Sequence, residues 1–348
     1  MPSAPRISFC IATMNRAGDL ADTLGSLARE ADATAEVVII DGSADDATQA
    51  VVERFRARLP ELHYRRLPPA GIDRDYARAV SEARGEYCWL FTDDDWLLPG
   101  VFAAVTRALE PAPDCIVVNV EYRDASMRRV ALTNCLGFDD DRAYGRGEYA
   151  RFVRDALPTL HYLGSLVVRR ELWMARHDTA FVGTYFAHVG RLFQQPLEGA
   201  TAIVGRPGIA TRIGVSSWSD HGFEIWMINW PTLVWHLPGI DEAARMKSTP
   251  REPWRDLKRL VRLRATGGFG RQDYERWIRP ARPGTWLRTW SWLLCRAPVG
   301  LVNVAARFYV RCFRPHMRIY ELELEGALAH WRRVQSSQTG AAPGATRP

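Results

Sequence analysis

The sequence lacks the features that mark several common classes of protein. Its six cysteines are widely separated along 348 residues and form no C-x-x-C pair, which argues against a zinc site or a disulfide framework and suits a reducing compartment. No stretch of about 18 or more uncharged apolar residues occurs, so we expect no membrane-spanning helix. The N-terminus also lacks a charged-then-apolar secretory signal. We therefore expect a cytoplasmic protein.

The composition that is present is ordinary for a globular protein, with 47% hydrophobic and 25% charged residues. The charge is divided unevenly along the chain. Residues 1–200 hold 23 basic and 29 acidic side chains, whereas residues 201–348 hold 23 and 11. This asymmetry predicts an acidic, metal-using half and a basic half that faces nucleic acid, phosphate or an anionic membrane.

Strands and helices are predicted to alternate through the first 122 residues. Leucine, valine and tyrosine recur at helical spacing between the apolar runs, and these runs predict strands at 7–12, 36–41, 64–67, 87–91 and 115–122. Such alternation predicts an α/β fold with a mostly parallel sheet flanked by helices. Ligands of such sheets bind at the carboxyl ends of the strands.

Three consecutive acids, Asp93, Asp94 and Asp95, follow the predicted strand at 87–91. Adjacent carboxylates repel one another, and a divalent cation is a suitable partner because hard cations take oxygen ligands. The alternative is a solvated turn or a helix N-cap, where Asp is also favoured. Residues 13–16 and Asp41 fall at the ends of other predicted strands. This shared edge favours a binding site.

The pattern is weaker between residues 123 and 215. It predicts strands at 128–133, 164–168, 200–204 and 209–213, and helices at 147–157 and 170–175, with residues 206–208 separating the last two strands. We expect this stretch to form the acceptor half of one domain over residues 1–215, whose nucleotide half covers about 1–122.

A basic, tryptophan-rich helical region is predicted over residues 216–335, followed by a disordered tail at 336–348. The segments 254–264 and 299–314 each place apolar residues on one helical face and arginines on another. This pattern is typical of helices at a membrane surface. Alternatively, each helix packs its apolar face on the protein and leaves its arginines in water.

Four motifs in the first 110 residues occur in a fixed order. They are Ala12-Thr13-Met14-Asn15-Arg16, then Asp41-Gly42-Ser43-Ala44-Asp45-Asp46-Ala47-Thr48, then Ala83-Arg84-Gly85-Glu86-Tyr87, and finally Leu90-Phe91-Thr92-Asp93-Asp94-Asp95. In these motifs the chain resembles family-2 glycosyltransferases, which are inverting enzymes with a GT-A (Rossmann-like) fold. Gly71-Ile72-Asp73 with the three acids is most similar to the branch of bacterial O-antigen deoxysugar transferases of the abequosyl type.

The resemblance implies a nucleotide diphospho-sugar donor and a divalent ion, Mn²⁺ or Mg²⁺. Asp94 aligns with the metal-binding acid of the family's D-x-D motif and Asp93 with an acid near the ribose. Because Thr92 stands where many members have the first acid, Asp95 is a second candidate metal ligand. The nucleotide pocket is expected to include Thr13, Asn15, Arg16, Asp41 and Asp73. From the residues alone, Asp41 could instead cap a turn, Asp73 could cap the helix at 74–84, and Arg16 could pair with a nearby acid.

Inversion requires a general base to deprotonate the acceptor hydroxyl. Family members usually take it from an acid late in the domain, and the corresponding stretch here, residues 182–188, has none. His188 is a candidate because its ordinary pKa lies near neutrality, although a buried structural role is the alternative. Asp220 is the second candidate for the catalytic base, and His161 and His221 are further ones. Arg206 and Arg212 could bind the diphosphate or simply be solvated.

We expect a metal-dependent inverting glycosyltransferase that acts on a saccharide acceptor, lipid-linked at the inner face of a bacterial membrane, in surface polysaccharide synthesis. An anionic membrane surface is an expected partner and nucleic acid is not. A nucleotidyltransferase is one alternative, but residues 13–18 are not the glycine-rich phosphate loop that such enzymes usually carry. A non-catalytic protein that binds nucleotides or nucleic acid is the other, and the basic half shows no recognised nucleic-acid-binding motif.

Overall fold

The computed structural model describes residues 5–32, 34–177, 180–214, 221–314 and 317–339. The chain forms two compact units, and each is made of separate stretches of sequence. The first unit comprises Met1–Tyr122, Thr133–Thr211 and Asn229–Arg251, and the second comprises Arg123–Leu132, Arg212–Ile228 and Glu252–Pro348. The stretch Asn229–Arg251 lies beyond the domain boundary expected near residue 215, yet it belongs to the first unit.

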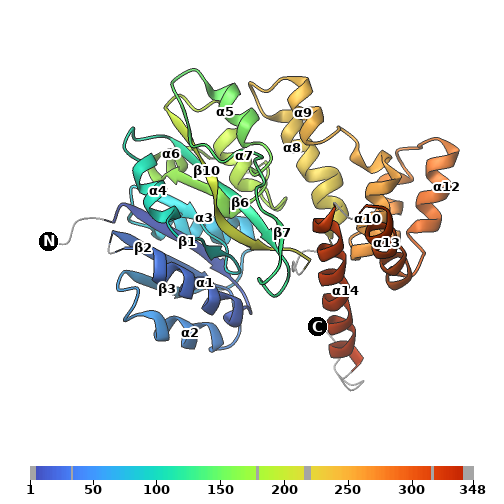
Figure 1. Ribbon diagram of the computed structural model, residues 1–348, viewed down its shortest axis with the longest axis horizontal. Coiled ribbons are helices and arrows are strands. Elements are labelled where there is room, and N and C mark those ends of the chain that lie inside the picture. The colour runs from blue at the N-terminus through green and yellow to red at the C-terminus, as the bar shows by residue number, and fades with distance from the viewer. Residues whose placement is uncertain (1–4, 33, 178–179, 215–220, 315–316, 340–348) are drawn as a thin grey trace. The chain divides into compact units, whose positions relative to one another are not determined.

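A mixed sheet forms the centre of the first unit (Figure 1). Its path is β3-β2-β1-β4-β9-β6-β10-β5, and β8 pairs with β10. The strands are β1 Ile7–Thr13, β2 Ala35–Asp41, β3 Leu62–Arg66, β4 Tyr87–Leu90, β5 Trp96–Leu97, β6 Cys115–Arg123, β8 Arg142–Tyr144, β9 Leu166–Arg169 and β10 Thr201–Arg212; the short strand β7 Val130–Leu132 belongs to the second unit. Strands β3, β2, β1 and β4 run parallel, and β9 is antiparallel to β4 and β6. The predicted α/β fold is confirmed.

Helices cover both faces of this sheet because its central strands are apolar on both faces. Phe9 and Ile11 of β1 share one core with Leu20 and Leu24, whereas the helix that carries Tyr76 packs against β1 and β2 outside that core. The helices of the first unit are α1 Ala17–Glu30, α2 Ala47–Phe55, α3 Ile72–Glu82, α4 Val101–Ala108, α5 Tyr149–Ala156, the short 3-10 turn Leu163–Ser165, α6 Arg170–Ala175, α7 Ala187–Phe193, α8 Trp230–His236 and α9 Glu242–Ser248.

Strand β10 corrects one prediction from the sequence. The expected strands at 200–204 and 209–213 form one continuous strand, and Arg206-Pro207-Gly208 lies inside it rather than between two strands. The backbone passes close to α4 at this point, because a Cβ atom on Gly208 would lie 2.0 Å from a methyl carbon of Val101. The glycine therefore allows close packing of the strand against the helix.

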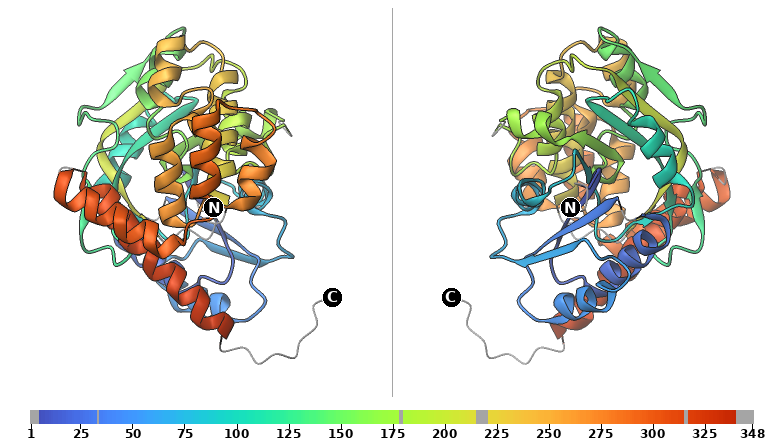
Figure 2. Two further views of the ribbon diagram at one scale, coloured as in Figure 1. Left: turned by 90° about the vertical axis from the view of Figure 1, so that its right-hand side faces the viewer. Right: turned by 90° about the vertical axis from the view of Figure 1, so that its left-hand side faces the viewer.

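The second unit is mostly helical and has its own apolar core, which includes Phe223, Trp254, Leu260 and Phe269. Its helices are the π-helix Glu224–Asn229, the 3-10 turn Pro253–Arg255, α10 Leu257–Thr266, α11 Arg271–Asp273, the π-helix Tyr274–Ile278, α12 Thr285–Leu294, α13 Val299–Phe313 and α14 Arg318–Thr339, the long red helix of Figure 2. Helix α14 includes the first residues of the predicted tail. Within the described residues, no single helix is both long and apolar enough to cross a membrane, and α12 and α13 meet that criterion only as a pair bent by 110°.

Candidate active site at the carboxyl edge of the sheet

The carboxyl ends of the parallel strands meet at one edge of the sheet. Thr13, the last residue of β1, pairs with Asp41, the last residue of β2, and β4 ends at Leu90, opposite Cys10 of β1. The acid triplet follows β4 within five residues. The structure thus brings the strand ends that carry polar residues in the sequence to a common edge.

Arg16 joins two acids of the triplet. Its Nη1 lies 3.1 Å from Oδ1 of Asp93, and its Nη2 donates to Oδ2 of Asp94 at 2.5 Å. The hydroxyl of Thr13 donates to the other oxygen of Asp93 at 2.7 Å. Arg16 also lies 3.4 Å from Asp19. Arg16 thus pairs with nearby acids in this structure, and two of them, Asp93 and Asp94, belong to the candidate site.

Asp93 and Asp95 sit in an environment that disfavours their negative charge. Burial raises the pKa of Asp93 to about 7, against the opposing effect of Arg16 and with a further increase from Asp94. Burial, with a contribution from Asp94, also raises the pKa of Asp95 well above its ordinary value. A cation bound at this edge would stabilise the charged carboxylates and lower these pKa values.

Asp95 differs from its two neighbours because it is enclosed by the protein. Its side chain is fully buried, and its Oδ2 accepts a hydrogen bond from the hydroxyl of Tyr162. Its backbone oxygen accepts a bond from Thr23 at 2.9 Å. In contrast, a fifth of the Asp94 side chain is exposed. Of the two candidate metal ligands, Asp94 is therefore the more accessible one.

A divalent ion fits this arrangement only if a bound molecule supplies part of its coordination. Among the residues that the structure describes, no three His, Cys, Asp or Glu side chains are grouped as a metal site. Mg²⁺ commonly binds through one or two carboxylates and completes its coordination with water and substrate phosphates. Asp94, the accessible acid of the triplet, could supply one such carboxylate.

Asp41 holds the turn after β2. Its Oδ1 accepts from the backbone N–H of Ser43, and its Oδ2 accepts from the hydroxyl of Tyr64, both at 2.8 Å. Ser43 in turn accepts from the backbone N–H of Asn15, also at 2.8 Å, where Asn15 adopts a φ of 58°. Asp41 therefore caps a turn, as the alternative from the sequence states. Through Ser43, the same turn also holds the loop that carries Asn15.

Asp73 links two distant parts of the first unit. Its Oδ2 accepts from the backbone N–H groups of Gly183 at 2.7 Å and Tyr185 at 3.3 Å. Burial raises its pKa, against the opposing effect of these hydrogen bonds. The N-cap of α3 is Gly71, so the alternative in which Asp73 caps its own helix is wrong. Asp73 instead orders the segment that precedes α7.

His188 lies inside the protein on α7, with 3% of its surface exposed. Burial lowers its pKa to about 3, so it is a poor proton acceptor, and this placement matches the structural alternative. Burial likewise lowers the pKa of His161 to about 4. Asp220 lies outside the described residues. His221 and Arg206 are exposed, and Arg212 ends β10.

Two tyrosines at this edge were missed in the sequence. Tyr64 of β3 donates to Asp41, and Tyr162 donates to Asp95 and lies 3.5 Å from the hydroxyl of Thr92. Tyr64 stands in a predicted strand next to β2, so its neighbourhood was inferable. Tyr162 is 67 residues from Asp95 in the chain, and no local pattern indicates this contact.

Comparison with known proteins adds to this geometry. Residues 8–171 match the family described as Glycosyl transferase family 2. The chain is 28% identical over 204 residues to abequosyltransferase RfbV of Salmonella typhimurium, an alignment that covers 53% of this chain and 59% of that protein. An uncharacterized protein of Mycobacterium tuberculosis is 28% identical over 109 residues, which cover 31% of this chain and 34% of that protein. The chain thus matches less than two thirds of the length of these relatives.

A solved structure shares the fold. The structure of S. aureus TarS 1–349 in complex with UDP-GlcNAc covers 95% of this chain and 92% of its own, with a TM-score of 0.50 and 13% sequence identity. At this identity the likeness concerns the fold. The family match includes all four sequence motifs and every strand end described above. The chain therefore contains a glycosyltransferase domain of family 2, over residues 8–171.

Proposed function

We propose that the chain transfers a sugar, with inversion, from a nucleotide diphospho-sugar to a saccharide acceptor, and that it uses Mn²⁺ or Mg²⁺. The observation that carries this proposal is the network of Thr13, Arg16, Asp93 and Asp94. It lies at the sheet edge where α/β folds bind their ligands. The match to Glycosyl transferase family 2 supports sugar transfer rather than another reaction of nucleotides.

The side chains at the edge have separate roles in this proposal. A bound divalent ion would neutralise the charge that develops on the departing diphosphate, with Asp94 as its principal protein ligand. Asp93, held by Thr13, would face the ribose. Arg16 would place a further positive charge beside the phosphates. Asp41 still has acceptor capacity beyond its two hydrogen bonds, because a carboxylate offers about four lone-pair sites, and would accept from the nucleotide.

Inversion also needs a base that takes the proton from the acceptor hydroxyl. The low pKa of His188 argues against that role. We propose Asp220, the second candidate from the sequence, for this role. If Asp220 is the base, an Asp220→Asn variant should keep donor binding while it loses transfer.

The acceptor is proposed from similarity to abequosyltransferase RfbV. This similarity favours a donor that carries a deoxysugar or hexose, and an acceptor of the O-antigen type in a bacterial surface polysaccharide. We propose that the acceptor saccharide is lipid-linked and that the protein reaches it from the cytoplasm, at the inner face of the membrane.

The test is a panel of UDP-, GDP-, CDP- and dTDP-sugars, assayed for release of the nucleotide with Mn²⁺, with Mg²⁺ and with a chelator. We expect release from one class of donor, dependent on the ion, and faster release when a lipid-linked saccharide is added. Absence of release from every donor, with either ion, would contradict the proposal. Pyrophosphate release from a nucleoside triphosphate would favour nucleotidyl transfer instead.

A further inference from the structure

Helices α12 and α13 leave an unusual amount of apolar surface exposed. Most of the large apolar side chains that are exposed in the described residues belong to these two helices. They are Trp286, Trp290, Trp292, Leu293, Leu301, Val304, Phe308, Tyr309 and Phe313. Exposed apolar side chains that gather on neighbouring elements commonly mark sites of interaction.

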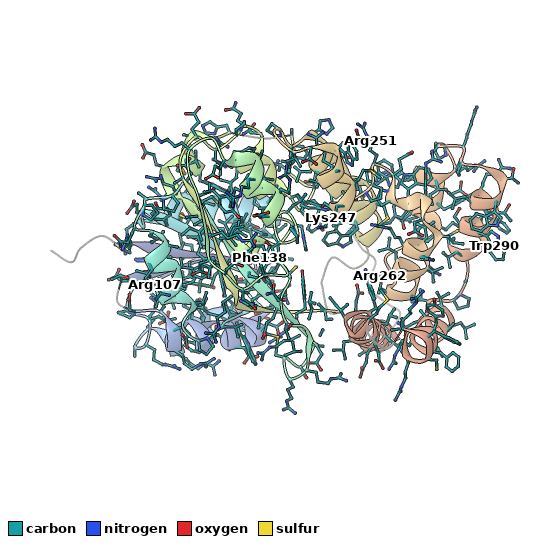
Figure 3. The ribbon with its side chains drawn as sticks, turned by 45° about the horizontal axis from the view of Figure 1, so that its top comes forward. Arg107, Phe138, Lys247, Arg251, Arg262 and Trp290 are labelled. Carbon is teal, nitrogen blue, oxygen red and sulfur yellow. The ribbon has the colours of Figure 1, made fainter. Side chains whose placement is uncertain are left out.

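On α13 three of the exposed side chains form one stripe along the helix. Leu301, Val304 and Phe308 are 69%, 58% and 65% exposed, and their spacing of three and four residues places them on one face. On α12, Trp286 and Trp290 are four residues apart and 64% and 48% exposed; Trp290 is labelled on α12 in Figure 3. Each helix therefore presents an exposed apolar stripe, formed by Trp286 and Trp290 on α12 and by Leu301, Val304 and Phe308 on α13.

A buried asparagine fixes the orientation of α13. Asn303 is fully buried, and its amide nitrogen donates to the backbone oxygens of Ala265 and Leu324, each at 2.9 Å. Both acceptors belong to the same compact unit as α13. A rotation of α13 that buried its apolar stripe would break both bonds and strand a buried amide. The outward direction of the stripe is therefore built into the packing.

The charge around this surface has one sign. Residues 282–314 contain six arginines and neither aspartate nor glutamate. Arg288, Arg311 and Arg314 are exposed, and the guanidinium of Arg296 lies 4.1 Å from the ring centre of Trp292. Tryptophan and arginine beside an apolar face suit the boundary between lipid headgroups and acyl chains.

We propose that α12 and α13 form a docking surface for an anionic lipid bilayer, into which the apolar stripe inserts while the arginines contact the headgroups. The 110° bend between the helices suits attachment at the interface. The proposal goes beyond glycosyl transfer, and lipid binding can be measured whether or not transfer occurs. A second copy of the chain is a poorer occupant, because a symmetric interface would bring the same arginines of both copies together.

Helix α10 differs from α13 in how its apolar face is covered. The two segments have the same pattern in the sequence, yet Trp254, just before α10, is 5% exposed within the core of the second unit, and Leu257 of α10 packs against that core. The expectation that the apolar face of 254–264 meets a membrane is therefore wrong, and the packing alternative holds there. Only the second segment, 299–314, keeps its apolar face exposed.

The test is sedimentation of the full chain with phosphatidylcholine vesicles that contain phosphatidylglycerol, compared with vesicles of phosphatidylcholine alone. We expect binding to the anionic vesicles and weaker binding to the neutral ones. A Leu301→Ser/Phe308→Ser variant should bind the anionic vesicles roughly tenfold or more weakly, because it loses the free energy gained when two large apolar side chains move from water into the bilayer. The matched control is Met174→Ser/Met246→Ser, which changes two exposed apolar residues of the first unit and should bind as the wild type does.

A second pair of variants tests the charge. Arg311→Gln/Arg314→Gln should weaken binding to anionic vesicles by roughly fivefold for each arginine, and added salt should reduce the difference. The control Arg58→Gln/Arg107→Gln changes two exposed arginines of the first unit (Figure 3 labels Arg107) and should leave binding unchanged. Nucleotide release from a soluble donor, measured for each variant, reports on the proposed function separately.

Three results would overturn the proposal. The first is a wild-type chain that stays in the supernatant with anionic vesicles. The second is equal binding by the wild type and both α13 variants. The third is a lipid-free dimer, seen by analytical ultracentrifugation, that the Leu301→Ser/Phe308→Ser variant abolishes, because a second copy would then cover the surface.

Discussion

Two buried carboxylates lie at opposite ends of the parallel strands of the first unit. Asp93 follows β4 at the carboxyl edge, and Glu36 lies near the start of β2 at the other edge. Each has an arginine partner, Arg16 at 3.1 Å and Arg84 at 2.8 Å. Burial raises the pKa of Asp93 to about 7. For Glu36 burial acts in the same direction, but hydrogen bonds from Arg84 and Ser8 outweigh it and lower the pKa.

The difference lies in how completely each carboxylate is hydrogen-bonded. Glu36 accepts bonds from the hydroxyl of Ser8 at 2.5 Å and from the backbone N–H and Nε of Arg84, each at 2.8 Å. Ser8 also accepts from the backbone N–H of Gly85, where a Cβ atom would lie 2.5 Å from the Ser8 hydroxyl. The motif at 83–87 therefore builds a stable ion pair. Asp93 has fewer donors and an acidic neighbour, which is the condition in which a ligand cation stabilises a site.

The largest effect is expected from Asp94→Asn. Loss of the proposed metal ligand should lower the rate of donor turnover by roughly a hundredfold or more, because the charge stabilisation by a metal is worth several kcal/mol. The fold should persist, since the Asp94 side chain is partly exposed. Nucleotide release as a function of Mn²⁺ concentration and the melting temperature measure the two effects. Unchanged activity and unchanged metal dependence would remove Asp94 from this role.

The opposite result is expected at the other edge. Glu36→Gln should destabilise the protein by roughly 1–3 kcal/mol, because it breaks a buried, charged hydrogen-bond network, while activity per folded molecule is kept. Urea unfolding of the variant measures the change. The control is Glu110→Gln, which removes an exposed ion pair with Arg6 in which the Glu110 side chain is 74% exposed, and such pairs contribute about 1 kcal/mol or less. Lost activity at unchanged stability would show that Glu36 is functional.

The two carboxylates should also give opposite pH dependences of stability. The pKa of Glu36 is lowered in the folded state, so its contribution is present above the ordinary value near 4.3 and is lost as the pH falls through the folded pKa. The pKa of Asp93 is raised to about 7, so the folded state binds the extra proton between about pH 4 and 7, and stability falls as the pH rises through that window.

Urea unfolding across this pH range, without divalent ions, tests the difference. Asp93→Asn should flatten the loss of stability between about pH 4 and 7, and Glu36→Gln should flatten the loss at lower pH. If both variants flatten the same part of the profile, the contrast between the two edges is refuted.

The elements that the sequence predicts well are those set by short-range pattern. Continuous apolar runs gave the strands β1, β2 and β4, and the rule for parallel sheets placed their polar ends on one edge. The sequence predicted two strands where the structure has the single strand β10. Gly208 allows close packing on Val101, which is more than 100 positions away in the chain, so no local pattern indicates its role. Similarly, α10 and α13 have the same periodicity, and only their tertiary neighbours determine which apolar face is covered.

In the candidate site too, the sequence predicted which strand ends meet but did not predict contacts between segments that are distant in the chain. Thr13, Arg16 and Asp93 were assigned to one site because each follows a strand, and their contacts now connect them. The partner of Asp73 is a backbone group 110 residues away, and sequence spacing carries no information about such a contact. The burial of His188 was likewise invisible, because an imidazole in an apolar helix suits a base and a core residue equally.

The smallest effect that still separates the candidate site from the rest of the unit is expected at Tyr162. The variants Tyr162→Phe and Tyr144→Phe each delete a tyrosine hydroxyl that donates to an aspartate, Asp95 in one case and Asp155, at 2.7 Å, in the other. Each should cost about 1 kcal/mol of stability in urea unfolding. Only Tyr162→Phe should also reduce nucleotide release, by a few fold, because Asp95 adjoins the proposed metal ligand Asp94. Equal loss of activity in both variants would mean that the Tyr162 contact serves the fold alone.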